Sequence, residues 1–260
     1  MNETSTLSEQ LVLSFSGIDG AGKSTQIYRL HQALQRAGLR VELITFWDDV
    51  AALRFLREEI AHMVFRGDRG VGSPEAPVRR FDKNVKSPFL TLFRMAIYVL
   101  DAFSLRRVSE KLRSEGPGAR ADVIIFDRFI YDELANLNLE RALTCFYIRT
   151  LLRLAPRLNL AFLLDADSDA AFARKPEYPP EFLRSNRAAY LGLARMVGMT
   201  VIAPSSIDEA HKEILRLVQN VKETLLPDID AEGHVSDQGV CFERKSEIHD
   251  GKTAVSHLLS

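Results

Sequence analysis

Residues 14–26 read SFSGIDGAGKSTQ, and they directly follow the apolar run Leu11–Leu13. After this stretch the chain becomes amphipathic, so we expect the backbone to turn here from a buried strand into a helix that starts near Lys23. Glycines in such a turn let successive backbone N–H groups point into one concavity, and the start of the helix adds its positive end. The stretch therefore predicts an anion-binding loop.

The spacing of Gly17, Gly22, Lys23 and Ser24 fits the pattern G-x-x-x-x-G-K-[ST]. Lys23 is expected to reach the β- and γ-phosphates of a nucleotide, and the Ser24 hydroxyl is expected to bind Mg²⁺. We predict that the bound nucleotide is ATP. The residues expected to bind it are Gly17, Asp19, Gly20, Ala21, Gly22, Lys23, Ser24 and Thr25.

Five short apolar segments alternate with helix-period segments. They are Leu11–Phe15, Val41–Thr45, Val123–Phe126, Leu160–Leu164 and Thr200–Ile202. Such alternation is typical of right-handed βαβ crossovers and of a parallel sheet covered on both faces. We therefore predict an α/β protein with the P-loop NTPase fold: a five-stranded, mostly parallel sheet, helices on both faces and a short lid.

Three of the connecting helices can be placed from their patterns. Ile27, Leu30 and Leu34 form one stripe of a first helix that ends near Gly38. The last helix has its apolar residues at helical spacing between positions 207 and 221, and a long helix is expected over 89–112.

The chain has 260 residues, of which 46% are hydrophobic, so we expect one main domain over 1–225. Within it, the glycine-, proline- and arginine-rich stretch 66–88 predicts a mobile basic insertion. Residues 226–260 turn polar without sustained periodicity, which is typical of a disordered tail.

The charge balance and the absence of targeting patterns argue against several classes of protein. The formal net charge is -1, from 34 basic and 35 acidic residues, which gives no basic footprint for nucleic acid. We find no signal peptide pattern and no apolar run that could span a membrane, so we expect a cytoplasmic protein. The two cysteines are far apart and predict neither a disulfide framework nor a zinc site.

Asp127 and Arg128 directly follow the third predicted strand, at the carboxyl edge where parallel sheets bind ligands. The carboxylate can hold Mg²⁺ or orient an acceptor oxygen, and the guanidinium can bind a phosphate bidentately. Asp132 is a weaker candidate, which could equally be a helix N-cap.

A lid is predicted after the fourth strand, over 174–187. A helix begins near 170–175, and Pro176, Pro179 and Pro180 interrupt it before the next helix. Cations on such a lid can meet the charge that develops on a transferring phosphoryl group. The candidates are Arg174, Lys175, Arg184 and Arg187, and we favour Arg174.

The loop alone does not define a reaction. The N-K-x-D base-reading motif of GTPases is absent, since residues 82–84 read DKN, and no ABC-type signature loop is found. A small-molecule kinase fits better. Three stretches, FSGIDGAGKSTQ, DRF at 127–129 and LLDADSDAAFARK, resemble the thymidylate kinase family of nucleoside monophosphate kinases. The similarity extends over about 11–221, excluding 45–88.

The resemblance implies a role for each matching position. Asp19 would lie near the acceptor sugar, and Asp127 and Arg128 would serve the metal and the acceptor phosphate. Arg174 would clamp the donor phosphates, and Ala21 in the loop, where some members have Arg, resembles the subtype whose catalytic cation comes from the lid. The adenine-contacting loop would be 203–205.

Two departures concern the acceptor. An Arg-Glu-Pro-Gly segment of the family is replaced by Trp47, Asp48 and Asp49, and the two acids should disfavour an acceptor phosphate unless Mg²⁺ or a loop arginine offsets them. Trp47 could stack on a ring or belong to the core.

The second departure concerns the family's base-reading Phe and Arg pair, which lie four residues apart. This pair aligns with Phe103 and Arg107 in one register and with Ile97 and Asp101 in the other. The second register would remove the thymine-reading pair.

We therefore expect an ATP- and Mg²⁺-dependent kinase whose acceptor is dTMP or a related nucleoside monophosphate. Two alternatives stay open: a kinase of the same fold with another small-molecule acceptor, and a noncatalytic nucleotide-binding module. A homodimer is one assembly that the sequence allows.

Overall fold

A computed structural model describes residues 10–51, 88–114, 116 and 120–221 of the chain. The strands are β1 (Leu11–Ser16), β2 (Val41–Thr45), β3 (Val123–Asp127), β4 (Leu160–Leu164) and β5 (Thr200–Ile202). The α-helices are α1 (Lys23–Arg36), α3 (Pro88–Ser114), α4 (Ile130–Leu134), α5 (Ala142–Leu154), α6 (Ser168–Arg174), α7 (Pro180–Val197) and α8 (Ile207–Val221). A short π-helical turn, η1 (Phe46–Val50), follows β2.

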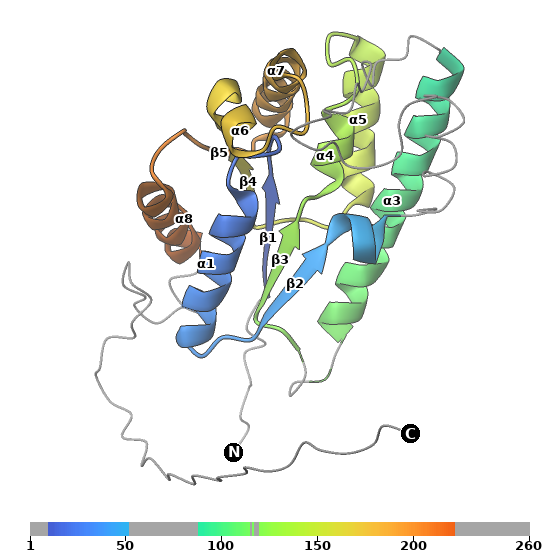
Figure 1. Cartoon of the computed structure of the whole chain (residues 1–260). Helices are drawn as coiled ribbons and strands as arrows, with labels where there is room; N and C mark the ends of the chain where they lie inside the picture. Colours follow the sequence, from blue (N-terminus) through green and yellow to red (C-terminus); the bar gives the residue numbers. More distant parts are fainter. Residues whose placement is uncertain (1–9, 52–87, 115, 117–119, 222–260) are drawn as a thin grey trace, which may run out of the picture.

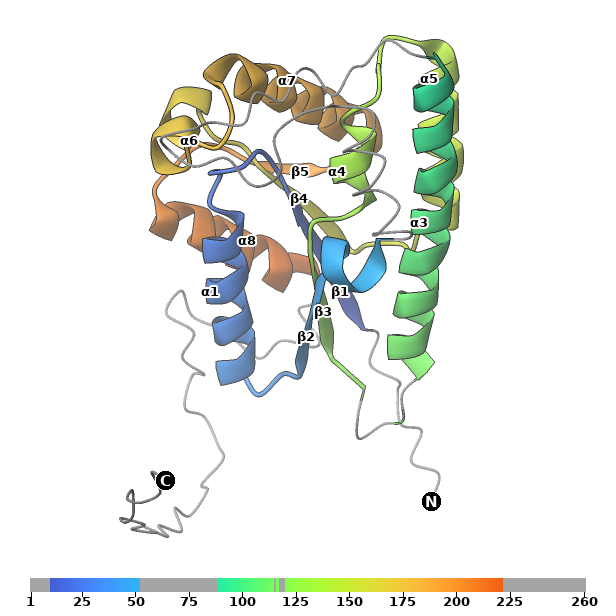
Figure 2. The same cartoon turned by 45° about the vertical axis from the view of Figure 1, so that its right-hand side comes forward.

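The five strands form one sheet in the order β2-β3-β1-β4-β5, and every neighbouring pair is parallel. The predicted fold class is therefore confirmed, and β1 and β3 each extend one residue beyond the predicted strand. Because all strands run the same way, their carboxyl ends meet at one edge, where α6 and α7 lie (Figure 2). The loop that follows the central strand β1 opens at this edge.

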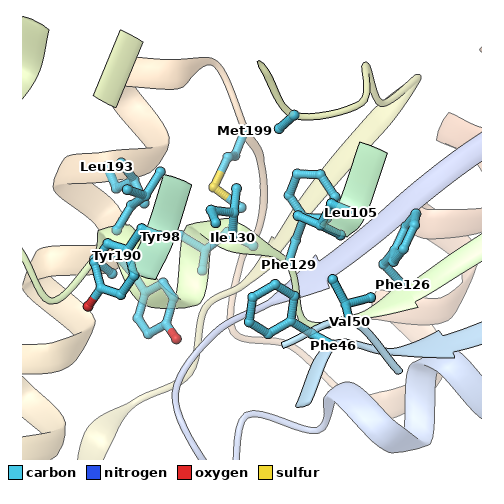
Figure 3. Packing of buried hydrophobic residues seen from close by; sticks show 14 of the residues in the cluster. Phe46, Val50, Tyr98, Leu105, Phe126, Phe129, Ile130, Tyr190, Leu193 and Met199 are labelled. Atoms are coloured by element: carbon cyan, nitrogen blue, oxygen red, sulfur yellow. The ribbon is translucent and has the colours of Figure 1, made fainter. Parts of the chain in front are cut away.

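Helices cover both faces of the sheet, as Figure 1 shows. Alternate residues of β1 explain this arrangement, because successive side chains of a strand point to opposite faces. Leu11, Leu13 and Phe15 belong to the buried cluster that includes apolar residues of α1 and α8. Val12 belongs to a second cluster, with apolar residues of α3, α4, α5 and α7, part of which Figure 3 shows. The central strand is thus buried on both sides.

The helix boundaries follow from glycine and proline positions. Gly22 precedes α1 and Gly38 follows it, with φ of 89° and 77°, in the left-handed region that favours glycine. The prediction of an α1 end near Gly38 is confirmed. One proline expectation was wrong: Pro88, placed in the insertion, is the first residue of α3. The predicted break after the lid helix is confirmed, because α6 ends at Arg174 and α7 begins at Pro180. Proline fits the first helical turn because its missing N–H has no partner there.

The turn η1 carries the residues that replace the family's Arg-Glu-Pro-Gly segment. Phe46 is fully buried, whereas Trp47 is 38% exposed and meets the Phe46 ring edge-on at a centroid distance of 5.1 Å. Trp47 is therefore not a core residue. The carboxylate of Asp49 accepts a hydrogen bond from the Thr45 backbone N–H (2.7 Å), which links the turn to β2.

Several predicted features lie outside the described residues. These are residues 66–87 of the basic insertion and the tail over 226–260. Within the part of the chain that the structure describes, no helix is long and apolar enough to cross a membrane.

The glycine loop packs so closely on α6 that a side chain at Gly20 should destabilise the protein. A Cβ on Gly20 would lie 2.5 Å from the Ala171 carbonyl oxygen, whereas a Cβ on Gly38 would have no neighbour within 4 Å. Both glycines have positive φ, so both alanine variants pay the left-handed backbone cost of about 1 kcal/mol. Gly20→Ala should therefore lower the free energy of unfolding by at least ~1 kcal/mol more than Gly38→Ala, since backbone must move to relieve the clash.

Urea denaturation of the two variants measures this difference. Equal losses in the two variants would contradict the close packing of α6 on the loop.

Candidate active site

The loop between β1 and α1 is held by close backbone contacts. A Cβ on Gly17 would lie 2.5 Å from the Leu164 carbonyl oxygen at the end of β4, and Gly20 has the same relation to Ala171 of α6. Neither position has room for a side chain. The glycines at 17 and 20 thus let β4 and α6 approach the loop directly, which fixes its path at the carboxyl edge of the sheet.

The N-terminus of α1 fits a phosphate group. Gly22, the residue before the helix, supplies no side-chain cap, and the first turn contains no acidic residue. Ser24 and Thr25 are exposed in the same turn. The backbone N–H groups of a helix start and its positive dipole end favour an anion, so the donor set matches the expected nucleotide phosphates.

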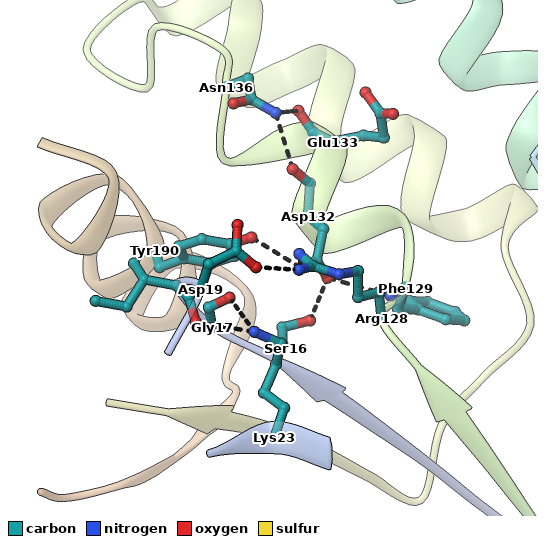
Figure 4. Close-up of polar contacts among 11 residues, drawn as sticks. Ser16, Gly17, Asp19, Lys23, Arg128, Phe129, Asp132, Glu133, Asn136 and Tyr190 are labelled. Atoms are coloured by element: carbon teal, nitrogen blue, oxygen red, sulfur yellow. Dashed lines mark hydrogen bonds and ion pairs between the residues drawn. The ribbon is translucent and has the colours of Figure 1, made fainter. Parts of the chain in front are cut away.

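Lys23 lies buried inside the loop. Its Nζ donates hydrogen bonds to the carbonyl oxygens of Gly17 (2.9 Å) and Ile18 (2.8 Å), as Figure 4 shows. Burial is the main cause that lowers the pKa of Lys23 to about 8, and the neighbouring charge of Arg128 lowers it further. A phosphate beside Lys23 would raise this pKa again, because its negative charge favours the protonated form of the lysine.

Asp127 and Ser24 are the residues that could hold Mg²⁺. Asp127 ends β3 and is half-buried, and burial raises the pKa of its carboxyl group. A divalent cation would offset that cost, and oxygen ligands are those that Mg²⁺ prefers. Among the described residues, no group of three or more His, Cys, Asp or Glu side chains could hold a metal ion. In nucleotide sites Mg²⁺ is commonly held by phosphates and water together with one or two protein ligands, a role that Ser24 and Asp127 could fill.

Arg128 is fixed from three sides. Its backbone N–H donates to the Phe15 carbonyl (3.0 Å), which joins it to β1. Its guanidinium contacts Asp19 of the loop (Nη2 to Oδ1, 2.5 Å) and Asp132 of α4 (Nη1 to Oδ1, 3.1 Å). Burial disfavours the charged form, but the carboxylates of Asp132 and Asp19 outweigh it and raise the pKa of Arg128. The sequence-predicted loop Asp and the DRF arginine are thus an ion pair.

Asp132 is not the helix N-cap that we considered, because it is the third residue of α4. Its carboxylate accepts hydrogen bonds from the Phe129 backbone N–H (3.2 Å) and from two hydroxyls, of Ser16 (2.7 Å) and Tyr190 (2.8 Å). Arg128 is the fourth donor (Figure 4). Sequence reasoning missed Ser16 and Tyr190, since one lies in a buried strand and the other follows the apolar pattern of α7.

The lid arginines differ in their partners. Arg174 of α6 donates from Nε to the Gly20 carbonyl of the loop (2.8 Å). Arg184 pairs with Asp169 (2.8 Å), and Arg187 pairs with Asp165 through two bonds of 2.6 and 2.8 Å. Carboxylates already neutralise the last two, whereas Arg174 contacts an uncharged carbonyl next to the phosphate-binding turn. Among these three arginines, Arg174 is therefore best placed to meet a donor phosphate.

The acceptor side differs from the family pattern. On α3, Ile97 and Asp101 are buried, whereas Phe103 is 44% exposed and Arg107 is exposed. The inward face of α3 thus carries Ile97 and Asp101, whereas Phe103 and Arg107 point away from the core, and this burial does not decide between the two registers. Asp101 lies near Tyr147 of α5: burial, and then the charges of Asp101 and Glu133, raise the pKa of the Tyr147 hydroxyl.

The loop expected to contact adenine, residues 203–205, is exposed between β5 and α8. Ser206 at its end forms a cap with Glu209, whose carboxylate accepts from the Ser206 backbone N–H (3.0 Å). The structure shows no feature of this loop that would by itself identify a base.

Comparison with known proteins finds thymidylate kinases among the relatives. No protein-family model matches the chain. A probable thymidylate kinase of Methanosphaera stadtmanae is 24% identical over 189 residues, which cover 71% of this chain and 84% of the relative. A probable thymidylate kinase of Pyrococcus abyssi is 27% identical, covering 78% of this chain and 93% of that protein.

A thymidylate kinase of Symbiobacterium thermophilum is 26% identical, and the match covers 80% of this chain and 92% of the relative. The crystal structure of a thymidylate kinase from Ehrlichia chaffeensis matches 81% of this chain and 99% of that chain, at 20% identity and a TM-score of 0.47. The resemblance in the sequence motifs is therefore confirmed: the chain is a distant relative of the thymidylate kinases.

Proposed function

We propose that this chain is an ATP- and Mg²⁺-dependent phosphotransferase that converts a nucleoside monophosphate, most simply dTMP, to the diphosphate. The observation that carries the proposal is the ion pair of Arg128 and Asp19 (2.5 Å), which brings the DRF segment against the phosphate-binding loop. A cationic acceptor-side residue thus lies beside the donor loop. The names of the three relatives, all thymidylate kinases or probable ones, support dTMP as the acceptor.

The donor phosphates would bind over the start of α1. The backbone N–H groups of the first turn would hold the phosphate oxygens, and Lys23 would leave the carbonyl oxygens of Gly17 and Ile18 to meet the β- and γ-phosphates. Ser24 and Asp127 would hold Mg²⁺, which when bound neutralises phosphate charge as the group transfers. These residue roles are part of the proposal.

Transfer would proceed by a single displacement. An oxygen of the acceptor phosphate forms a bond to the γ-phosphorus of ATP while the bond from that phosphorus to the β–γ bridging oxygen breaks, leaving ADP. The attacking oxygen already carries negative charge, so no general base is needed. Arg128 would orient the acceptor phosphate, and Arg174 would move from the Gly20 carbonyl to the charge that develops on the transferring group.

A second acceptor class is favoured by specific observations. In one of the two registers, Asp101 on the buried face of α3 takes the place of the family's arginine, and η1 adds Asp48 and Asp49 beside β2. An acidic surround favours an acceptor with hydrogen-bond donors or hydroxyls over a second phosphate, so a kinase of the same fold for another small molecule is the alternative. A noncatalytic module gains no support from the relatives. The cytoplasmic location, the absence of nucleic-acid partners and the homodimer remain predictions.

The acceptor can be identified by ADP release over a panel of compounds. The panel includes dTMP, dUMP, other nucleoside monophosphates, nucleosides and unphosphorylated sugars. We expect dTMP-dependent release that Lys23→Ala lowers at least ~100-fold, because the lost charge acts on the transferring phosphate. Release with an unphosphorylated acceptor, together with none for dTMP, would establish the alternative.

If Arg174 is the lid cation, its removal should lower the reaction rate more than it weakens ATP binding. Arg174→Ala should lower kcat at least ~10-fold while the Kd for ATP changes less than ~3-fold, because the charge acts chiefly in the transition state. Arg184→Ala is the matched control, since Asp169 already neutralises that exposed lid arginine. Steady-state kinetics and calorimetric ATP titrations measure both quantities. If Arg184→Ala loses the rate and Arg174→Ala keeps it, the assignment is wrong.

The low pKa of Lys23 makes ATP binding depend on pH. In the free protein this pKa is about 8, so the side chain loses its proton as the pH rises through 8. The bound phosphates favour the protonated form, so binding above pH 8 must take up a proton. The Kd for ATP should therefore rise roughly 20-fold between pH 7.5 and pH 9.5.

Lys23→Arg is the control for this pH dependence. A guanidinium stays charged throughout the range, so the variant should show a nearly constant Kd. The same rise in both proteins would show that another group titrates.

A further inference from the structure

The carboxylate of Asp132 has all of its hydrogen-bonding positions filled. Its side chain is 1% exposed, and each of its two oxygens accepts two hydrogen bonds. Oδ2 accepts from Ser16 and the Phe129 N–H, and Oδ1 is shared by Arg128 and Tyr190. A buried carboxylate with four donors is rigid, because moving it would leave several buried groups without partners.

Arg128 needs such support because its backbone is strained. Among the described residues it is the one non-glycine residue with a positive φ, 67°. Left-handed backbone costs a side-chain-bearing residue about 1 kcal/mol or more and persists where the surroundings enforce it. The contacts that enforce it here are the Phe15 carbonyl, Asp19 and Asp132.

Tyr190 brings a distant part of the chain to this arginine. It is buried on α7, the helix that follows α6, and α7 packs against α4 and β4. Arg174 at the end of α6 contacts the loop at Gly20. The α6–α7 pair therefore touches both the donor side of the site, through Arg174, and the acceptor side, through Tyr190 and Asp132.

We propose that Asp132 is a positioning residue for Arg128. Through the Asp132 carboxylate, the Tyr190 hydroxyl would couple the placement of α7 to the acceptor-side guanidinium of Arg128. The inference rests on the proposed function for its kinetic consequence. It assigns Tyr190 no contact with substrate: its hydroxyl shares Oδ1 with Arg128, so a shift of α7 changes the position of the carboxylate that the arginine contacts.

A purely structural role of Tyr190 would affect stability and not the acceptor kinetics. If the Tyr190 hydroxyl stabilised only the packing of α7, its removal would lower the melting temperature and leave the acceptor KM unchanged. Tyr147→Phe is the matched control, because its hydroxyl also makes one hydrogen bond inside the protein, to the Met95 carbonyl (2.5 Å), and has no contact with Arg128.

The test is Tyr190→Phe, which keeps the ring and removes the one hydroxyl. We expect kcat/KM for the acceptor to fall about fivefold while the KM for ATP changes less than ~2-fold, because losing a hydrogen bond of this kind changes an equilibrium by several-fold. In the background of Arg128→Ala, the same change should lower kcat/KM by less than ~1.5-fold, because residues that act through one another are non-additive. Equal losses in both backgrounds would overturn the inference.

A second measurement needs no acceptor and separates this inference from the proposed function. Phenylglyoxal modifies accessible guanidinium groups, and mass spectrometry of peptides gives the rate at Arg128. Tyr190→Phe should raise this rate about threefold over wild type, since one support of the carboxylate is lost. Tyr147→Phe should leave it unchanged. If the wild type phosphorylates no nucleotide, the proposed function fails, and the labelling rates still decide the role of Tyr190; equal rates in all three proteins would overturn it.

Discussion

The close approach of backbone to backbone at Gly17 and Gly20 is the constraint on which the site depends. A side chain at either position would lie 2.5 Å from a carbonyl oxygen, of Leu164 on β4 or of Ala171 on α6. These contacts place the loop between the central sheet and the helix that carries Arg174. A loop one methyl group further out would separate the start of α1 from the lid, and the Arg174 contact with the Gly20 carbonyl (2.8 Å) would be lost.

The second organising interaction is electrostatic. Arg128 is one cation between two carboxylates, Asp19 and Asp132, and its pKa is raised although burial opposes its charge. The same arrangement affects the acids: burial would raise the pKa of Asp19, but the charges of Arg128 and Lys23 outweigh it and lower the pKa. In the proposed reaction, an acceptor phosphate would have to compete with these carboxylates for the guanidinium.

Much of the fold could be predicted from local patterns. The strands, the end of α1 near Gly38 and the last helix follow from apolar periodicity and from glycine, which act within one segment of chain. The glycine loop was predictable because its function requires a fixed spacing of backbone and Lys23. The pair of Asp127 and Arg128 was placed at the correct sheet edge because parallel strands end together.

The remaining features depend on contacts between distant segments, which no local pattern encodes. The inward face of α3, with Ile97 and Asp101, is set by the packing of a helix whose residues are apolar on more than one side. Tyr190 lies 58 positions from Asp132, and its spacing in α7 is that of an ordinary core residue. Pro88 was assigned to the insertion because proline is typical of loops, but it fits the first turn of a helix equally well.

In the proposed reaction, the loop and the Arg128 cluster together transfer the γ-phosphoryl group of ATP to the phosphate of a nucleotide. Phosphorus NMR of a reaction with ATP, Mg²⁺ and dTMP tests it most directly, because each product has its own resonances. We expect the γ-phosphate signal of ATP to be lost as the signals of ADP and dTDP appear in equal amounts. Unchanged ATP, or release of inorganic phosphate without dTDP, would contradict it.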